Sequence, residues 1–124
     1  MIQKSLYTKL IACCLVILVI GVAPAAFAAN RQIVYLTAKS DLPFWNTLGK
    51  GVKEVVEVNG YTYREMDSKL SEATQLQNAK TAIAGGAVGI VISPTDSKSA
   101  TEVLDVASKA GVPVVIADIG TNGG

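Results

Sequence analysis

Short apolar runs separate longer stretches in which apolar residues recur every three or four positions. The runs are rich in Val and Ile, which is typical of strands buried on both faces. They occupy residues 32–38, 61–66, 88–93 and 112–117. Their starts lie roughly 25 residues apart, as expected for βαβ units joined by right-handed crossovers.

The stretches between the runs predict three amphipathic helices, over residues 44–59, over 72–84, and from Thr95-Asp96 to just before Gly111. Their apolar stripes consist of Leu48, Val52, Val55 and Val56, of Ala73, Leu76, Ala79 and Ile83, and of Val103, Leu104, Ala107 and Ala110. Strands wrapped by such helices predict an α/β fold, with a parallel sheet between two helical layers.

Cap residues support these helix limits. Gly60 is placed to end the first helix, and Ser71 to begin the second. For the third helix, Thr95 or Asp96 can accept from the free N–H groups, and Ser99 with Glu102 has the spacing of a capping box. We therefore expect residues 93–96 to be structural.

Residues 1–28 are expected to be a secretory signal. Lys4 and Lys9 precede an apolar run from Leu10 to Ala23, and residues 26–28 (Ala-Phe-Ala) have the small residues that a signal peptidase recognises. Cleavage after Ala28 would export residues 29–124 to the periplasm. An uncleaved anchor stays open, because residues 10–29 carry no charge and are long enough to span a bilayer.

Composition excludes several function classes for residues 29–124. Without Lys4 and Lys9, nine basic residues face ten acidic ones, so no positive surface for nucleic acid is expected. The chain has no histidine, and both of its cysteines lie in the expected signal. The usual nucleophile–base pairs and zinc ligands are therefore absent, as are phosphate-loop motifs. We expect no metal, no cofactor and no catalysis.

The segment after the first run holds the strongest candidate for a binding site, because ligands of open α/β sheets bind beyond the carboxyl ends of the strands. Phe44 and Trp45 lie side by side there at a helix start, behind Pro43. A flat aromatic ring can hold the apolar C–H face of a sugar. The alternative is that these rings pack beneath the helix as part of the core.

Asp118, directly after the last run, is the second candidate. A carboxylate accepts strong hydrogen bonds from sugar hydroxyls, although a turn or cap position would also explain it. Lys39 and Asp41 are further candidates, for which an exposed loop is the simpler interpretation.

Taken in order, several motifs resemble the ribose-type periplasmic binding proteins of sugar ABC transporters, over the whole of Arg31 to Asp118. They are Asp-Leu-Pro-Phe-Trp at 41–45, Gly51, Gly60, Val-Gly-Ile-Val-Ile-Ser-Pro-Thr-Asp-Ser at 88–97, and Ala-Gly-Val-Pro-Val-Val-Ile-Ala-Asp at 110–118. The resemblance implies part of the N-terminal lobe of a two-lobe protein that closes on one sugar. Phe44 and Trp45 match the family's sugar-contacting aromatic pair, and Asp118 matches its hydroxyl-binding acid. Leu42 and Ile119 replace the Asn and Arg that ribose binders usually carry, which argues against ribose itself.

The function implied is that of a monomeric carrier, which binds a monosaccharide or similar small polar solute and delivers it to a membrane ABC permease. A ligand sensor that docks on a membrane signalling receptor stays open as an alternative. A repressor core of the same fold is disfavoured by the export signal and by the lack of a basic helix-turn-helix. Because the chain stops just past the fourth run, we expect it to be a piece of a longer protein, without the second lobe and weak in binding by itself.

Overall fold

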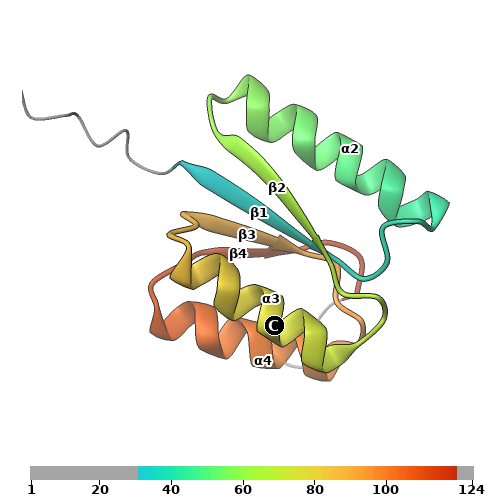
Figure 1. Cartoon of the computed structure of the whole chain (residues 1–124), viewed down its shortest axis with the longest axis vertical. Coiled ribbons are helices and arrows are strands. Elements are labelled where there is room, and N and C mark those ends of the chain that lie inside the picture. Colours follow the sequence, from blue (N-terminus) through green and yellow to red (C-terminus); the bar gives the residue numbers. More distant parts are fainter. Residues whose placement is uncertain (1–30, 120–124) are drawn as a thin grey trace, which may run out of the picture.

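The computed structural model describes residues 31–119, so the expected signal segment lies outside the described residues. Strands and helices alternate along this part of the chain (Figure 1). They are β1 (Gln32–Thr37), α2 (Pro43–Val58), β2 (Thr62–Asp67), α3 (Glu72–Ala84), β3 (Gly89–Ile92), α4 (Ser97–Lys109) and β4 (Val114–Ile116). Each overlaps the segment predicted for it. Between residues 31 and 119, no helix is long and apolar enough to cross a membrane.

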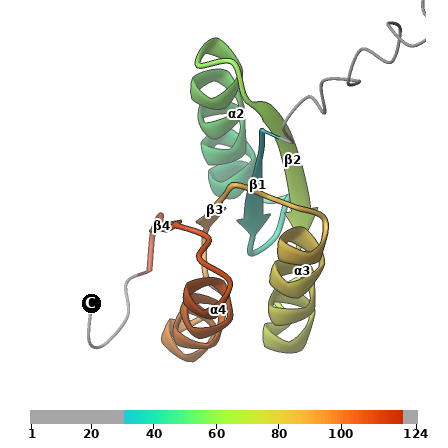
Figure 2. The same ribbon diagram turned by 90° about the vertical axis from the view of Figure 1, so that its left-hand side faces the viewer.

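The four strands form one parallel sheet in the order β2-β1-β3-β4. Helix α2 lies over β1 and β2 on one face, whereas α3 and α4 cover the other face (Figures 1 and 2). The predicted α/β fold, a parallel sheet between two helical layers, is therefore confirmed.

The two faces of the sheet differ in chemistry. The face toward α3 and α4 carries the hydrophobic core, formed by Val34, Leu36, Ile90, Ile92, Ala79, Ala82, Ala87, Val103 and Ala107. Burying one Val, Leu or Ile side chain contributes about 1.5–3 kcal/mol, so this face supplies most of the apolar stabilisation. Alternate residues of the same strands point toward α2, and there Tyr35, Thr37 and Ser93 are fully buried.

Helix α3 buries part of the predicted stripe and two further residues. Ala79 is buried as expected, and Leu76 and Ile83 are half-buried, whereas Ala73 is exposed. Gln75 and Ala82, which lay outside the predicted stripe, are also buried. Gln75 can be buried because backbone groups of the loop after β3 form hydrogen bonds with both the nitrogen and the oxygen of its side-chain amide. Its Nε2 donates to the Ser93 carbonyl at 3.0 Å, and its Oε1 accepts from the Thr95 N–H at 3.0 Å.

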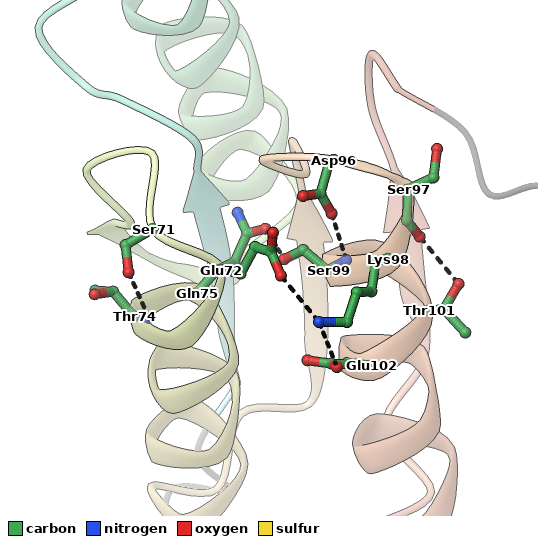
Figure 3. A network of polar contacts seen from close by, with 10 residues as sticks. All are labelled: Ser71, Glu72, Thr74, Gln75, Asp96, Ser97, Lys98, Ser99, Thr101 and Glu102. Atoms are coloured by element: carbon green, nitrogen blue, oxygen red, sulfur yellow. Dashed lines mark hydrogen bonds and ion pairs between the residues drawn. The ribbon is translucent and has the colours of Figure 1, made fainter.

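Two of the predicted helix caps are confirmed, and the capping box predicted for the third helix is not. Ser71 accepts from the Thr74 N–H at 3.2 Å, and Asp96 accepts from the Ser99 N–H at 2.7 Å (Figure 3). The predicted capping box of Ser99 and Glu102 is wrong. Ser99 lies inside the first turn of α4, and its hydroxyl donates to Gln75 Oε1 at 2.6 Å.

Polar contacts also join the two helices on the core side of the sheet. Lys98 of α4 lies 3.3 Å from Glu72 of α3 and 3.8 Å from Glu102 of its own helix (Figure 3).

At the end of α2, Gly60 has φ +76°, the left-handed conformation expected of a helix-ending glycine. Gly60 thus ends α2 at the turn that leads to β2.

Candidate functional site

The strand order brings the segments after β1 and β4 to either side of β3. In a parallel sheet all strands end at one rim, and here β3 lies between β1 and β4. Residues 38–42, which follow β1, and residues 117–119, which follow β4, therefore flank the end of β3. This is the position at which open α/β sheets bind ligands.

The aromatic pair stands at the first turn of α2, behind Pro43. Phe44 is 59% exposed, and Trp45 is half-buried. The two ring centroids are 5.9 Å apart with planes at 82°, an edge-to-face arrangement. Phe44 lines an open hollow of about 480 Å³ with Thr47 and Leu48. Phe44 is thus available for contact, whereas Trp45 partly packs as core, and its Nε1–H is buried without an acceptor among residues 31–119.

Asp118 follows β4 at the opposite side of the β3 end and is exposed. Its φ of +95° is unusual for a residue with a side chain, although Asp adopts such values more often than most. The pKa of Tyr35 is raised, chiefly by burial and also by the charges of Glu65 and Asp118. The position of Asp118 fits both a turn residue and an acid that faces a ligand.

Lys39 and Asp41 form an ion pair in the loop that leads to α2. Lys39 Nζ lies 3.8 Å from Asp41 Oδ1, and the Asp41 side chain is 72% exposed. Exposed pairs of this kind contribute only about 0–1 kcal/mol. The structure places both residues on the surface of this loop. This agrees with an exposed loop, the simpler of the two interpretations, rather than with a ligand contact.

A hydrogen bond that the sequence did not indicate anchors this loop. Ser40 Oγ donates to Asp67 Oδ2 at 2.9 Å, and the Lys69 N–H donates to Asp67 Oδ1 at 2.8 Å. Burial alone would raise the pKa of Asp67, but these hydrogen bonds to the carboxylate lower it. The loop between β1 and α2 is thereby tied to the carboxyl end of β2.

The end of β3 carries a buried hydroxyl pair that sequence reasoning also missed. Ser93 Oγ lies 2.8 Å from the Tyr35 hydroxyl. The Thr37 hydroxyl is near enough to lower the pKa of Tyr35, but it does not reach hydrogen-bonding geometry. The available signal was Ser93 itself, a polar residue at the end of the apolar run 88–93. Residues 93–96 were expected to be structural, and Asp96 is indeed the cap of α4, as predicted.

The carboxylates do not gather into a metal site. Among residues 31–119, no three His, Cys, Asp or Glu side chains lie close enough together to hold an ion. What the rim offers is an exposed aromatic ring, an exposed acid and buried hydroxyls, which are groups suited to an uncharged polar ligand.

A family model described as a periplasmic binding protein domain matches residues 33–124. The chain belongs to this family. The resemblance stated from the motifs is thus confirmed. Curated relatives in the family include the ribose import binding protein RbsB of Haemophilus influenzae, 28% identical over 102 residues, which are 82% of this chain and 35% of that protein. RbsB of Escherichia coli is 27% identical over 90 residues, 73% of this chain and 30% of that protein.

Solved structures of periplasmic binding proteins share the fold. The periplasmic ribose ABC transporter protein of Conexibacter woesei is 27% identical, with a TM-score of 0.69 over 77% of this chain and 32% of that one. The Caulobacter myo-inositol binding protein, solved with myo-inositol, has a TM-score of 0.71 over 84% of this chain and 34% of that one. At 22% identity, the second comparison shows the fold alone. The chain spans about a third of the length of the curated relatives it matches.

Proposed function

We propose that the protein captures a monosaccharide or a similar small polar solute in the periplasm and passes it to a membrane ABC permease, without catalysis. One observation supports this proposal: the strand order places the segments after β1 and β4, which lead to the exposed Phe44 and Asp118, on either side of the end of β3. An aromatic face holds the C–H face of a sugar, and a carboxylate accepts from its hydroxyls. The names of the relatives, which are import binding proteins for ribose, support the same class of ligand.

The residues proposed to contact the solute are Phe44, Trp45 and Asp118, with Asp41 and Lys39 at the margin. We further propose that residues 1–28 are a cleaved signal, and that residues 29–124 form part of one lobe of a two-lobe monomer. Leu42 and Ile119 are both 38% exposed. Apolar side chains at these positions favour a solute other than ribose.

Titration calorimetry of the full-length protein against pentoses, hexoses and cyclic polyols tests this function. At least one member should bind. Asp118→Asn should then lower the affinity about 10-fold or more, because hydrogen bonds to a charged acceptor contribute about 1.5–3 kcal/mol. Phe44→Ala, which removes the exposed ring, should weaken binding by a similar factor.

The matched control is Asp105→Asn, an exposed acid on α4 that pairs with Lys109 at 2.7 Å. It should leave the affinity unchanged. If no member of the panel binds, the proposal is contradicted. It is also contradicted if Asp105→Asn and Asp118→Asn change the affinity equally.

A further inference from the structure

Helix α2 begins without a cap of its own. Leu42 stands at the position where Ser, Thr, Asp or Asn usually accepts from the first free N–H groups, and a leucine side chain has no atom that can do so. Residues 43–46, the first turn, include no acidic side chain that could interact with the helix dipole. Helix ends without such partners fray most easily. Yet this turn carries Phe44 and Trp45, the aromatic pair proposed to contact the solute.

The first turn is held instead from a neighbouring strand. Ser40 Oγ donates to Asp67 Oδ2 at 2.9 Å, across the gap between the loop before α2 and the end of β2. The carbonyl of the same serine accepts from Asn46 Nδ2 at 3.4 Å, a long hydrogen bond. The Asn46 N–H donates to the Leu42 carbonyl at 3.0 Å. Ser40 therefore links Asp67 to the first turn of α2.

The base of this link is itself fixed. Directly after it, Lys69 and Leu70 both adopt left-handed conformations, with φ of +51° and +57°. Such conformations are strained for residues with side chains, so they persist only where surrounding contacts hold them. The Lys69 N–H donates to Asp67 Oδ1 at 2.8 Å, and the Leu70 N–H donates to the Ala38 carbonyl at 2.8 Å. The Asp67 carboxylate is thus presented from a backbone that is also tied to the end of β1.

The bond between Ser40 and Asp67 is well suited to act as an anchor. Both residues are half-buried, which limits competition from water. Burial raises the pKa of Asp67, but hydrogen bonds from the Lys69 backbone and from the side chain and backbone of Ser40 lower it overall. The carboxylate is therefore ionised at neutral pH, and a charged acceptor forms the stronger hydrogen bond.

We propose that Asp67 is a positioning residue, which holds the first turn of α2 through Ser40 and so presents the exposed Phe44 ring to the solute. This inference rests on the proposed function and adds to it a residue that acts through another group. With the anchor in place, the ring is already ordered when the solute arrives, so binding loses less conformational freedom.

Hydrogen exchange of the full-length protein without solute, measured by mass spectrometry, tests the anchor itself. Ser40→Ala and Asp67→Ala should speed exchange of the amides of residues 46–48 about 3–10-fold, whereas the amides of α4 keep their wild-type rates. Glu65→Ala is the matched control. Glu65 is also a carboxylate of β2 that accepts from a hydroxyl, at 2.8 Å, but its donor is Tyr63 of the same strand. Faster exchange in α4 as well as in α2 would show a merely structural role and overturn the inference.

Titration calorimetry with the tightest-binding solute of the panel tests the consequence for binding. Ser40→Ala and Asp67→Ala should each lower the affinity about 3–10-fold, the effect of one hydrogen bond, and Glu65→Ala should leave it unchanged. Because both residues act through one link, combining the two substitutions should weaken binding no further than the more damaging of them alone. Asp67→Asn keeps an oxygen for the Ser40 hydroxyl, so it should recover most of the affinity that Asp67→Ala loses.

The outcomes separate this inference from the proposed function. If the wild type binds a solute and Ser40→Ala binds it equally well, or if the two losses add in the combined variant, the inference is overturned and the proposed function stands. If the wild type binds no member of the panel, both are overturned.

Discussion

Replacing Gln75 with leucine should destabilise the fold strongly, because Gln75 is a buried amide that satisfies three other groups. Its side chain is fully buried. It donates to the Ser93 carbonyl at 3.0 Å and accepts from the Thr95 N–H at 3.0 Å and from the Ser99 hydroxyl at 2.6 Å. Leucine has a similar volume, so the packing of α3 against the sheet is largely kept. The loss falls on the hydrogen bonds.

The expected magnitude follows from the groups left behind. The Ser99 hydroxyl can rotate toward another acceptor, but the Ser93 carbonyl and the Thr95 N–H are fixed in the backbone. Each buried group left unsatisfied costs about 1–3 kcal/mol. The apolar burial of leucine offsets part of this loss. The free energy of unfolding should therefore fall by about 2–4 kcal/mol in total. Domains have only about 5–15 kcal/mol in total, so this is a large fraction.

Urea unfolding followed by circular dichroism measures this loss. The midpoint for Gln75→Leu should fall, with an unchanged dependence on urea concentration. Gln77→Leu is the matched control, since Gln77 is exposed on the same helix and its Nε2 donates to the Thr81 hydroxyl at 3.4 Å. It should change the free energy of unfolding by less than about 0.5 kcal/mol. If the two variants unfold at the same midpoint, Gln75 does not hold the loop after β3.

Two glycines of α2 should respond to alanine in opposite ways. At Gly49 a Cβ would lie 3.1 Å from Cε1 of the fully buried Tyr35 ring, and overpacking of this kind costs about 1–3 kcal/mol. At Gly51 nothing lies within 4 Å, so alanine should stabilise the helix by about 0.5–1 kcal/mol. Urea midpoints that move in the same direction would refute this difference. Asp67 should make stability depend on pH, because its folded pKa is lowered despite burial. Its contribution is complete above the unfolded pKa of about 3.9 and is lost as the pH falls through the folded value. Asp67→Asn, which keeps an oxygen for the Ser40 hydroxyl, should therefore flatten the loss of stability below about pH 4, and an unchanged acid profile would contradict the assignment.

The apolar pattern was enough to predict every element between residues 31 and 119, and for α3 even the limits, 72 and 84. Periodicity, helix caps and turn glycines are properties of neighbouring residues, so they can be read along the chain. The motifs 41–45, 88–97 and 110–118 also identified the family, because they occur in order along almost the whole match. Pro43 likewise indicated where the first helix starts, but the sequence left open which of Phe44 and Trp45 is exposed.

Tertiary structure alone decided which periodic residues are buried and which side chains meet. Gln75 is buried beside Ala79 of the expected stripe because Ser93 and Thr95, about 20 residues away, form hydrogen bonds with its side-chain amide. The hydroxyl pair of Tyr35 and Ser93 joins positions 58 residues apart. The order β2-β1-β3-β4 places the end of β3 between the two candidate segments. Such contacts depend on how strands are arranged across the sheet, and a one-dimensional pattern of apolar and polar residues does not encode that arrangement.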